Sequence, residues 1–114
     1  MNMPTFETAR KIAQTFGNVE EATSYGTPAL KVGGKLIARL KEDNESLVVP
    51  VDFEQRNEIL AADPETYYIT DHYLKYPYIL VRLSRVHPDA LRDLLLGACR
   101  AVGKSKRRAS KRAK

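Results

Sequence analysis

The side chains best suited to acid–base chemistry are concentrated in one short segment, from Asp71 to Tyr76. Asp71 precedes His72, and a carboxylate beside an imidazole can orient a histidine that acts as a general base. Such a base needs a nucleophile to activate, and no serine or cysteine of the chain lies in a recognisable nucleophile motif. We therefore expect His72 to hold its loop or to cap a strand, and we predict that the protein is not an enzyme.

Side chains that could bind a soft metal ion are also scarce. They are His72, His87 and Cys99. They show no paired spacing of the kind that zinc sites use. His87 directly precedes Pro88, a favoured first residue of a helix, and Cys99 has the character of a small core residue. The sequence predicts no metal ion and no cofactor.

Tyrosines in this segment and in a second turn form another candidate site. Tyr25 begins the segment Tyr-Gly-Thr-Pro, which fits a shaped surface turn, and Tyr73 and Tyr76 follow the histidine. Clustered tyrosines could stack on a base or a small ligand, or bind a protein partner. The alternative, which the sequence favours, is a rigid turn docked on a sheet beside the Tyr73 and Tyr76 loop. In the first interpretation the ligand or partner surface consists of Tyr25, His72, Tyr73 and Tyr76.

The basic charge of the chain is concentrated near its C-terminus. The net charge is +5 over 114 residues, but residues 104–114 contain seven basic residues and no acid. Residues 1–103 contain 12 basic and 14 acidic residues, so their net charge is −2. The seven cations are Lys104, Lys106, Arg107, Arg108, Lys111, Arg112 and Lys114.

Two interpretations of this basic segment stay open. Seven cations without a counter-charge can form an arm that binds phosphates and releases their counterions. Alternatively, the segment is a solubility tail or an address signal. It contains no aromatic residue, so binding through it should be insensitive to nucleotide sequence. Because it has almost no hydrophobic residues, we predict a disordered tail at 104–114 after a domain of residues 1–103.

Four more cations lie in a predicted β-hairpin around Gly33 and Gly34. A two-residue loop would pair Val32 with Lys35 and would mix apolar and basic residues on one face. A three-residue loop would pair Lys31 with Lys35 and separate the two kinds of residue, so we favour it. It places Leu30, Leu36, Ala38 and Leu40 on one face and Lys31, Lys35, Arg39 and Lys41 on the other, which Ile37 interrupts. This basic face could lie on a phosphate backbone, or it is an ordinary solvated face whose lysines prevent edge pairing.

The spacing of apolar residues predicts one α+β domain with the element order α-β-β-β-α-β-β-α. Helices are expected at about residues 4–16, 53–63 and 88–102, and strands at about 29–32, 36–40, 47–51, 66–70 and 78–83. Residues 18–28 show no clear period, and we expect a loop there. Short joints favour antiparallel neighbours, so we predict two layers, with helices packed on one face of a five-stranded antiparallel sheet.

Apolar stripes predict which side of each helix faces this sheet. In the first helix the stripe is Phe6, Ala9, Ile12, Ala13 and Phe16; in the second it is Phe53, Ile59 and Leu60; in the third it is Leu91, Leu94, Leu95, Ala98 and Val102. Thr5 is expected to cap the first helix and Asp52 the second. Gly103 is expected to end the third.

Several segments, in a fixed order, carry a resemblance to a known family. They are Thr23–Leu36, Val51–Phe53, Ala61–Thr66, His72-Tyr73, Tyr76-Pro77 and Leu80–Leu83. Over essentially residues 5 to 103 the chain resembles the MmcQ/YjbR-like family of small bacterial proteins. The resemblance implies a secretion-chaperone-like fold with five antiparallel strands, and DNA binding in a double-wing arrangement whose wings are two β-hairpins. The chain departs from many relatives at Ala98-Cys99, where they carry a tryptophan, and in the basic segment after Gly103.

These observations lead to one expected function and one alternative. We expect a non-enzymatic protein that binds nucleic acid, DNA in the first place, with little sequence selectivity, through the hairpin face and the basic segment. The alternative is a protein-interaction or chaperone-like adaptor that uses the exposed sheet and the tyrosines. The single cysteine suits a reducing compartment, and no apolar run is long enough to span a bilayer, so we expect a cytoplasmic location and no membrane partner.

Overall fold

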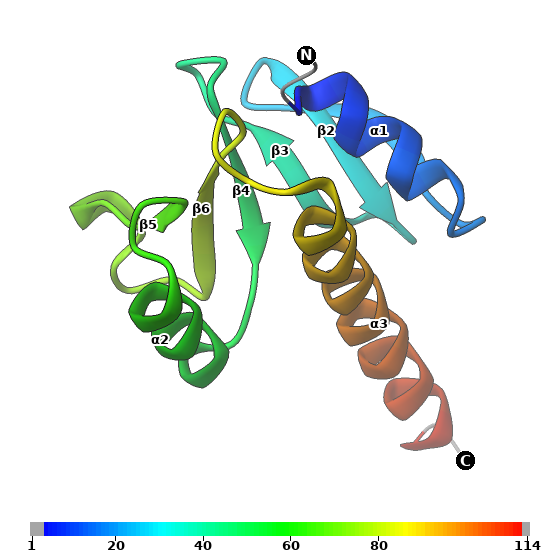
Figure 1. Ribbon diagram of the computed structural model, residues 1–114. Helices are drawn as coiled ribbons and strands as arrows, with labels where there is room; N and C mark the ends of the chain where they lie inside the picture. The colour runs from blue at the N-terminus through cyan, green and yellow to red at the C-terminus, as the bar shows by residue number, and fades with distance from the viewer. Residues whose placement is uncertain (1–3, 113–114) are drawn as a thin grey trace.

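A six-stranded antiparallel sheet forms the centre of the chain, with α1 and α3 packed on one of its faces (Figure 1). The computed structural model describes the backbone of residues 4–112 and the side chains of residues 4–102. The helices are α1 (Phe6–Gln14), α2 (Phe53–Ala62) and α3 (Pro88–Arg112), with a short 3₁₀ helix η1 (Asp71–Tyr73). The strands are β1 (Glu20–Ser24), β2 (Thr27–Val32), β3 (Lys35–Leu40), β4 (Ser46–Pro50), β5 (Tyr67–Tyr68) and β6 (Tyr78–Arg82).

The helices begin where their capping residues predict. The hydroxyl group of Thr5 accepts a hydrogen bond from the backbone N–H of Thr8 at the start of α1. The carboxylate of Asp52 accepts one from the backbone N–H of Gln55, at 2.7 Å, at the start of α2. These bonds satisfy donors that the first turn of a helix leaves without a partner.

The α+β class and the antiparallel sheet are confirmed, but the sheet has six strands instead of the predicted five. The strand order is β1-β2-β3-β4-β6-β5. The additional strand is β1, which lies inside the segment that was predicted to be a loop. β1 is an edge strand that pairs only with β2, and each of its five residues is exposed or only partly buried. An edge strand with so little buried surface leaves no apolar period in the sequence.

Both faces of the sheet carry buried residues. On β4, Leu47 and Val49 belong to the main core under α1 and α3. Val48 lies between them and belongs to a second cluster, with Leu80 and Tyr73, on the opposite face. This alternation follows from the two-residue period of a strand. The second face is therefore partly covered by the segment that contains η1.

Most of the predicted inward-facing residues are confirmed. Ala9 and Ala13 of α1 are fully buried, and in α3 the buried residues are Leu91, Leu94, Leu95 and Ala98. The prediction is wrong for Phe53 of α2, which is 45% exposed. The residue of α2 that is buried is Arg56.

The last helix extends further than predicted. α3 runs to Arg112, so the prediction that it ends at Gly103 is wrong. A single glycine costs a helix only about 1 kcal/mol relative to alanine, and the alanine, lysine and arginine residues that follow are strong helix formers. The disorder predicted for residues 104–114 concerns motion in solution and stays a prediction. Residues 113–114 and the side chains of the basic segment lie outside the described residues.

The β2–β3 hairpin has a two-residue turn in place of the predicted three-residue loop. Val32 pairs with Lys35, and Lys31 pairs with Leu36, across a two-residue turn. Both turn glycines have positive φ, as a type I′ turn requires. A bulge then shifts the register, so that Leu30 pairs with Ala38. The favoured three-residue loop is wrong because a bulge, and not the turn, brings Leu30, Ala38 and Leu40 to the core face. Leu36, which was predicted on that face, pairs with Lys31 and lies on the opposite face.

Candidate functional site

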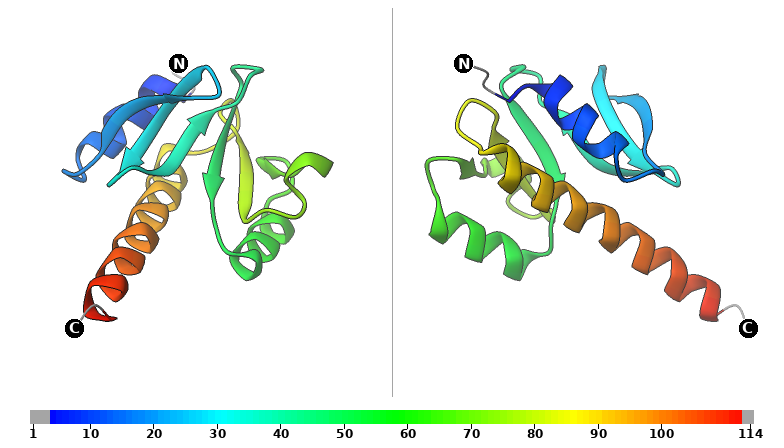
Figure 2. Two further views of the ribbon diagram at one scale, coloured as in Figure 1. Left: turned by 180° about the vertical axis from the view of Figure 1, so that it is seen from behind. Right: turned by 45° about the vertical axis from the view of Figure 1, so that its right-hand side comes forward.

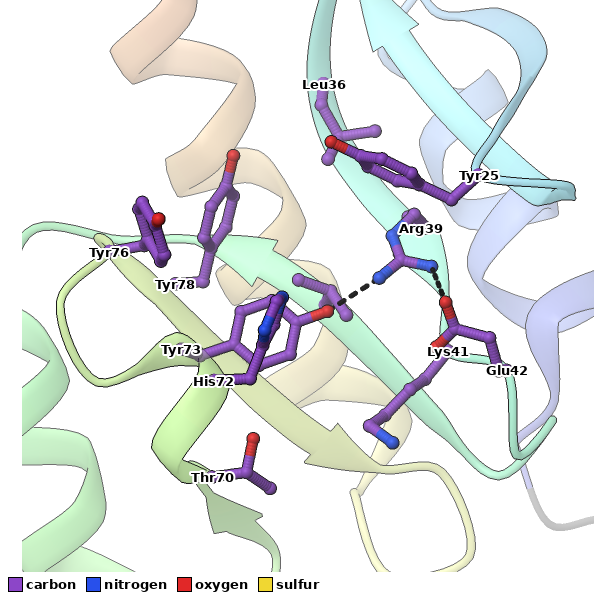
Figure 3. A pocket seen from close by; sticks show the side chains of 11 residues that line it. Tyr25, Leu36, Arg39, Lys41, Glu42, Thr70, His72, Tyr73, Tyr76 and Tyr78 are labelled. Carbon is purple, nitrogen blue, oxygen red and sulfur yellow. Dashed lines mark hydrogen bonds and ion pairs between the residues drawn. The ribbon is translucent and has the colours of Figure 1, made fainter.

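A pocket opens on the face of the sheet opposite α1 and α3 (Figure 3). Its volume is about 660 Å³, within the range of small-molecule sites. Three parts of the chain line it: the β1–β2 turn, β3 with the loop after it, and the segment around η1 with the adjacent strands. The lining residues are Tyr25, Leu36, Arg39, Lys41, Glu42, Val48, Thr70, His72, Tyr73, Tyr76 and Tyr78.

The β1–β2 turn holds Tyr25 at the mouth of this pocket. Tyr25 and Gly26 have φ values of 54° and 80°, the left-handed values that a type I′ turn needs at both central residues. Asparagine or glycine normally fills the first of these positions, and a bulky residue there is strained. The tyrosine side chain is 85% exposed, and its ring lies 5.2 Å from the Arg39 guanidinium carbon. A costly backbone conformation thus presents an aromatic ring to solvent, which is a mark of functional sites.

The opposite wall of the pocket is a network of aromatic rings. Tyr73 is 8% exposed and meets His72 edge-on at 4.8 Å between ring centroids. Tyr73 also meets Tyr78 edge-on at 6.0 Å, and His72 lies 6.4 Å from Tyr76. These are favourable distances for aromatic pairs. The rings of this wall therefore support one another.

The structure brings together all four residues of the predicted ligand or partner surface. Tyr25, His72, Tyr73 and Tyr76 line the same pocket, so the prediction that the Tyr25 turn lies beside the Tyr73 loop is confirmed. The ring of Tyr25 is open to solvent, and only that of Tyr73 is docked on the sheet. Among the described residues no carboxylate is bonded to His72, and the oriented base that Asp71 suggested is not formed.

Arg39 lies on the floor of the pocket, so its predicted place on a solvent-facing basic surface is wrong. It was predicted to face water as part of a basic ribbon, but it is only 4% exposed. Its Nη2 donates a 2.6 Å hydrogen bond to the Tyr73 hydroxyl group. Its Nη1 lies 3.3 Å from Thr27 Oγ1, 3.3 Å from Glu42 Oε2 and 3.4 Å from a backbone oxygen. The segment around η1 covers part of this face of the sheet, so Arg39 faces the pocket and not open solvent.

A second buried arginine, which sequence reasoning missed, supports the aromatic wall. Arg56 of α2 is 6% exposed, and the ring of Phe53 covers its guanidinium group at 4.8 Å. The group donates to four backbone oxygens, those of Tyr73, Leu74, Tyr76 and Tyr78, at 2.8 to 3.3 Å. The stripe predicted for α2, Phe53, Ile59 and Leu60, has only three residues, and nothing in it indicates that Arg56 is buried.

The charged groups at the pocket already have partners. Glu42 lies 3.3 Å from Arg39 Nη1, and Lys41 Nζ lies 3.9 Å from Asp43. The pKa of Glu42 lies below its usual value, chiefly because its carboxylate accepts a hydrogen bond from its own backbone N–H, and secondly because of the Arg39 charge. Glu42 is therefore ionised at neutral pH. The pocket is lined by two cations, Arg39 and Lys41, and one anion, Glu42, and each cation has a carboxylate beside it.

The other cations of the predicted basic ribbon do not form a continuous face. Lys31 is partly buried and pairs across strands with Glu20. Lys35 is exposed at the hairpin turn. With Arg39 buried and Lys41 beside Asp43, the hairpin keeps two cations that can reach a phosphate. For the cations from Lys104 to Arg112 the structure describes only the backbone, which belongs to α3.

Neither a metal centre nor a membrane span is found in the described part of the chain. Within residues 4–102, no three side chains among histidine, cysteine, aspartate and glutamate come together as a metal site would need. No described helix combines the length and the hydropathy that crossing a bilayer requires.

The fold and the pocket define a small α+β domain with a ligand-sized aromatic site on an open sheet. The chain belongs to the YjbR family, whose family model matches residues 14–100. Its fold is similar to the crystal structure of Deinococcus radiodurans protein DR2400, of domain family DUF419. The two share 25% sequence identity with a TM-score of 0.75, over 90% of this chain and 80% of that one. Comparison with curated proteins finds no match.

Proposed function

We propose that the protein binds nucleic acid, with DNA as the first candidate, through the basic half of α3 and without catalysis. The observation that supports this most is the continuity of α3 from the packed core into the basic segment. In each view the second half of this helix projects away from the sheet (Figure 2). The segment can therefore reach a phosphate backbone while the core stays clear of it.

The spacing of the cations fits one side of a helix. Arg100, Lys104, Arg107 and Lys111 follow one another at intervals of four, three and four residues, the repeat that places residues on one helix face. Arg100, the first of the series, is exposed. Cations at this repeat suit binding along a groove or a strand of phosphates, which carries no sequence information by itself.

The body of the domain adds little to this interaction. Of the hairpin cations, Lys31 and Lys35 remain available, and the β2–β3 turn that holds them lies at the end of the sheet toward which α3 runs (Figure 1). In a double-wing arrangement this hairpin would be one wing, with two phosphate contacts at most. We place the activity in the cytoplasm, where Cys99 stays a free thiol.

The salt dependence of binding tests the proposal. Each neutralised phosphate contributes about −0.9 to the slope of log affinity against log salt on duplex DNA. Six contacts from α3 would give a slope near −5 and a loss of about 10³-fold in affinity between roughly 50 and 200 mM salt. Fluorescence anisotropy of a labelled duplex should show this slope. Replacing the seven cations of residues 104–114 with glutamine, which keeps helix propensity, should reduce it to about −2 or less in magnitude.

Two further variants separate the hairpin from the general charge of the domain. Lys31→Gln with Lys35→Gln should reduce the slope by at most about 2. Lys11→Gln with Lys75→Gln, an equal loss of charge at two exposed sites elsewhere, should leave it unchanged. If the glutamine-rich helix binds DNA as tightly as the natural one, the proposal is wrong. The adaptor alternative then becomes the better one.

A further inference from the structure

The donors of Arg39 are not all used inside the protein. Nη1 and one Nη2 hydrogen have acceptors, but the described residues offer none to Nε or to the second Nη2 hydrogen. Nε is not sealed in the core either, since within residues 4–102 the one side-chain nitrogen buried without a partner is Nε of Arg56. Nε therefore faces the pocket, and Nη2 lies beside it, bonded to Tyr73 of the pocket lining. The N–H groups on Nε and Nη2 are parallel, so they form a fork for two adjacent acceptors.

Tyr73 adds a third donor at the same place. Its hydroxyl oxygen accepts the 2.6 Å hydrogen bond from Arg39. A phenol that accepts one hydrogen bond keeps its own hydrogen to donate, and no described residue accepts it. Figure 3 shows the two groups meeting on the pocket floor, with Tyr25 on one side and His72 and Tyr78 on the other. A ligand here meets hydrogen-bond donors in its plane and aromatic rings around it.

The charges decide between an anion and a neutral ligand. The carboxylate of Glu42 already lies 3.3 Å from Arg39 Nη1, and Asp43 lies 3.9 Å from Lys41 Nζ. An anionic ligand would have to displace Glu42 or be repelled by it, since that carboxylate is ionised. A neutral ring with two adjacent acceptors meets no such cost.

We propose that this pocket binds a planar, neutral heteroaromatic ring that carries a ring nitrogen next to an exocyclic oxygen, as on the N7 and O6 edge of guanine. Arginine recognises that edge with the same two-pronged geometry, and tyrosine rings stack on bases of any kind. The source is a free nucleoside or nucleotide, or an unpaired base of a strand. The site does not depend on the basic half of α3, so this proposal and the proposed function fail separately.

Titration of the whole chain with neutral nucleosides tests the proposal, because they avoid the electrostatic pull of α3. Guanosine should shift the NMR signals of the Arg39 Nε–H group and of the Tyr25 and Tyr73 rings. It should bind about tenfold more tightly than adenosine, which presents an amino donor to Arg39 where guanine presents an oxygen. Equal binding of the two nucleosides, or no binding of either, overturns the proposal. So does a larger shift of the Arg39 Nε–H signal with benzoate or inorganic phosphate.

Variants divide the roles of the ring and the donors. Tyr25→Asn restores the preferred Asn-Gly turn, so the fold should persist while affinity for both nucleosides falls several-fold. Arg39→Gln should abolish the preference for guanosine; if that chain fails to fold, Tyr73→Phe, which keeps the ring, should reduce the same preference. Leu74→Ala, in the same loop but outside the lining, is the control and should change neither. A guanosine preference that survives both Arg39→Gln and Tyr73→Phe contradicts the assignment.

A competition experiment identifies the source of the ring. If a guanine-rich single strand displaces guanosine from the natural chain, and also from the chain with seven glutamines, the source is an unpaired base. If only free nucleotides displace guanosine, the source is a small molecule.

Discussion

Replacing Arg56 with methionine is expected to lower the free energy of unfolding by about 2–4 kcal/mol. The guanidinium group is buried and donates to four backbone oxygens of the segment from Tyr73 to Tyr78. Methionine keeps a stem of similar length but donates nothing, so buried carbonyl groups lose their partners. Urea unfolding followed by circular dichroism would measure the loss from the midpoint and slope.

A matched control is available in Arg85. Its side chain is 54% exposed and forms a surface ion pair with Glu65, which contributes at most about 1 kcal/mol. Arg85→Met should therefore cost much less than Arg56→Met, although the chemical change is the same. Arg56→Lys keeps the charge but loses the planar fork, and its cost should lie between the two. Equal losses for Arg56→Met and Arg85→Met would show that the carbonyl contacts do not stabilise the fold.

The Arg56 contacts also connect stability to the pocket. The four oxygens belong to the segment that carries the aromatic wall of Tyr73, Tyr76 and Tyr78. Faster hydrogen exchange of the backbone amides in this segment is expected in Arg56→Met under conditions where the core strands stay protected. The guanosine preference should weaken in parallel, because the Tyr73 hydroxyl group is no longer held in place.

Features set by local spacing could be predicted from the sequence. Thr5 and Asp52 cap their helices because a side chain and a backbone donor three residues later form a local pair. The buried stripe of α3 follows from the helical period alone. The proximity of the Tyr25 turn and the Tyr73 loop was also predicted, from the clustering of tyrosines in these two segments.

The hairpin register could not be predicted because the pattern argument assumed that one face of β3 is solvated. Ile37, Ala38, Arg39 and Leu40 are consecutive and all buried. Four buried residues in succession are possible only because a bulge changes the register and the second face is covered by the segment around η1. That covering comes from residues more than 30 positions away, and no local period records it.

The burial of the two arginines has the same origin. Arg39 bonds to Tyr73, 34 residues later, and Arg56 bonds to oxygens 17 to 22 residues later. A guanidinium group enters a core only where acceptors for its donors are already in place. The sequence shows the arginines but not the acceptors, so a buried arginine and a phosphate-binding arginine look the same in it.

Leu95 and Leu96 offer the sharpest test of how α3 is packed. Leu95 is 0% exposed and belongs to the main core, whereas Leu96, the next residue, is only partly buried and lies outside that cluster. Leu95→Ala removes packed atoms and leaves a cavity, which costs about 3 kcal/mol or more. Leu96→Ala removes the same atoms at the helix surface and gains a little helix propensity, so it should cost less than about 1 kcal/mol.

Thermal unfolding of the two variants should therefore differ, with the melting temperature of Leu95→Ala lower by roughly 10 °C or more. Similar melting temperatures would mean that the face of α3 assigned to the core is wrong. Because neither change alters a charge, both proteins should keep the natural salt slope of DNA binding at a temperature where they remain folded. A slope that falls in Leu95→Ala alone would show that the basic half of α3 needs the packed half to present its cations, which a flexible tail would not.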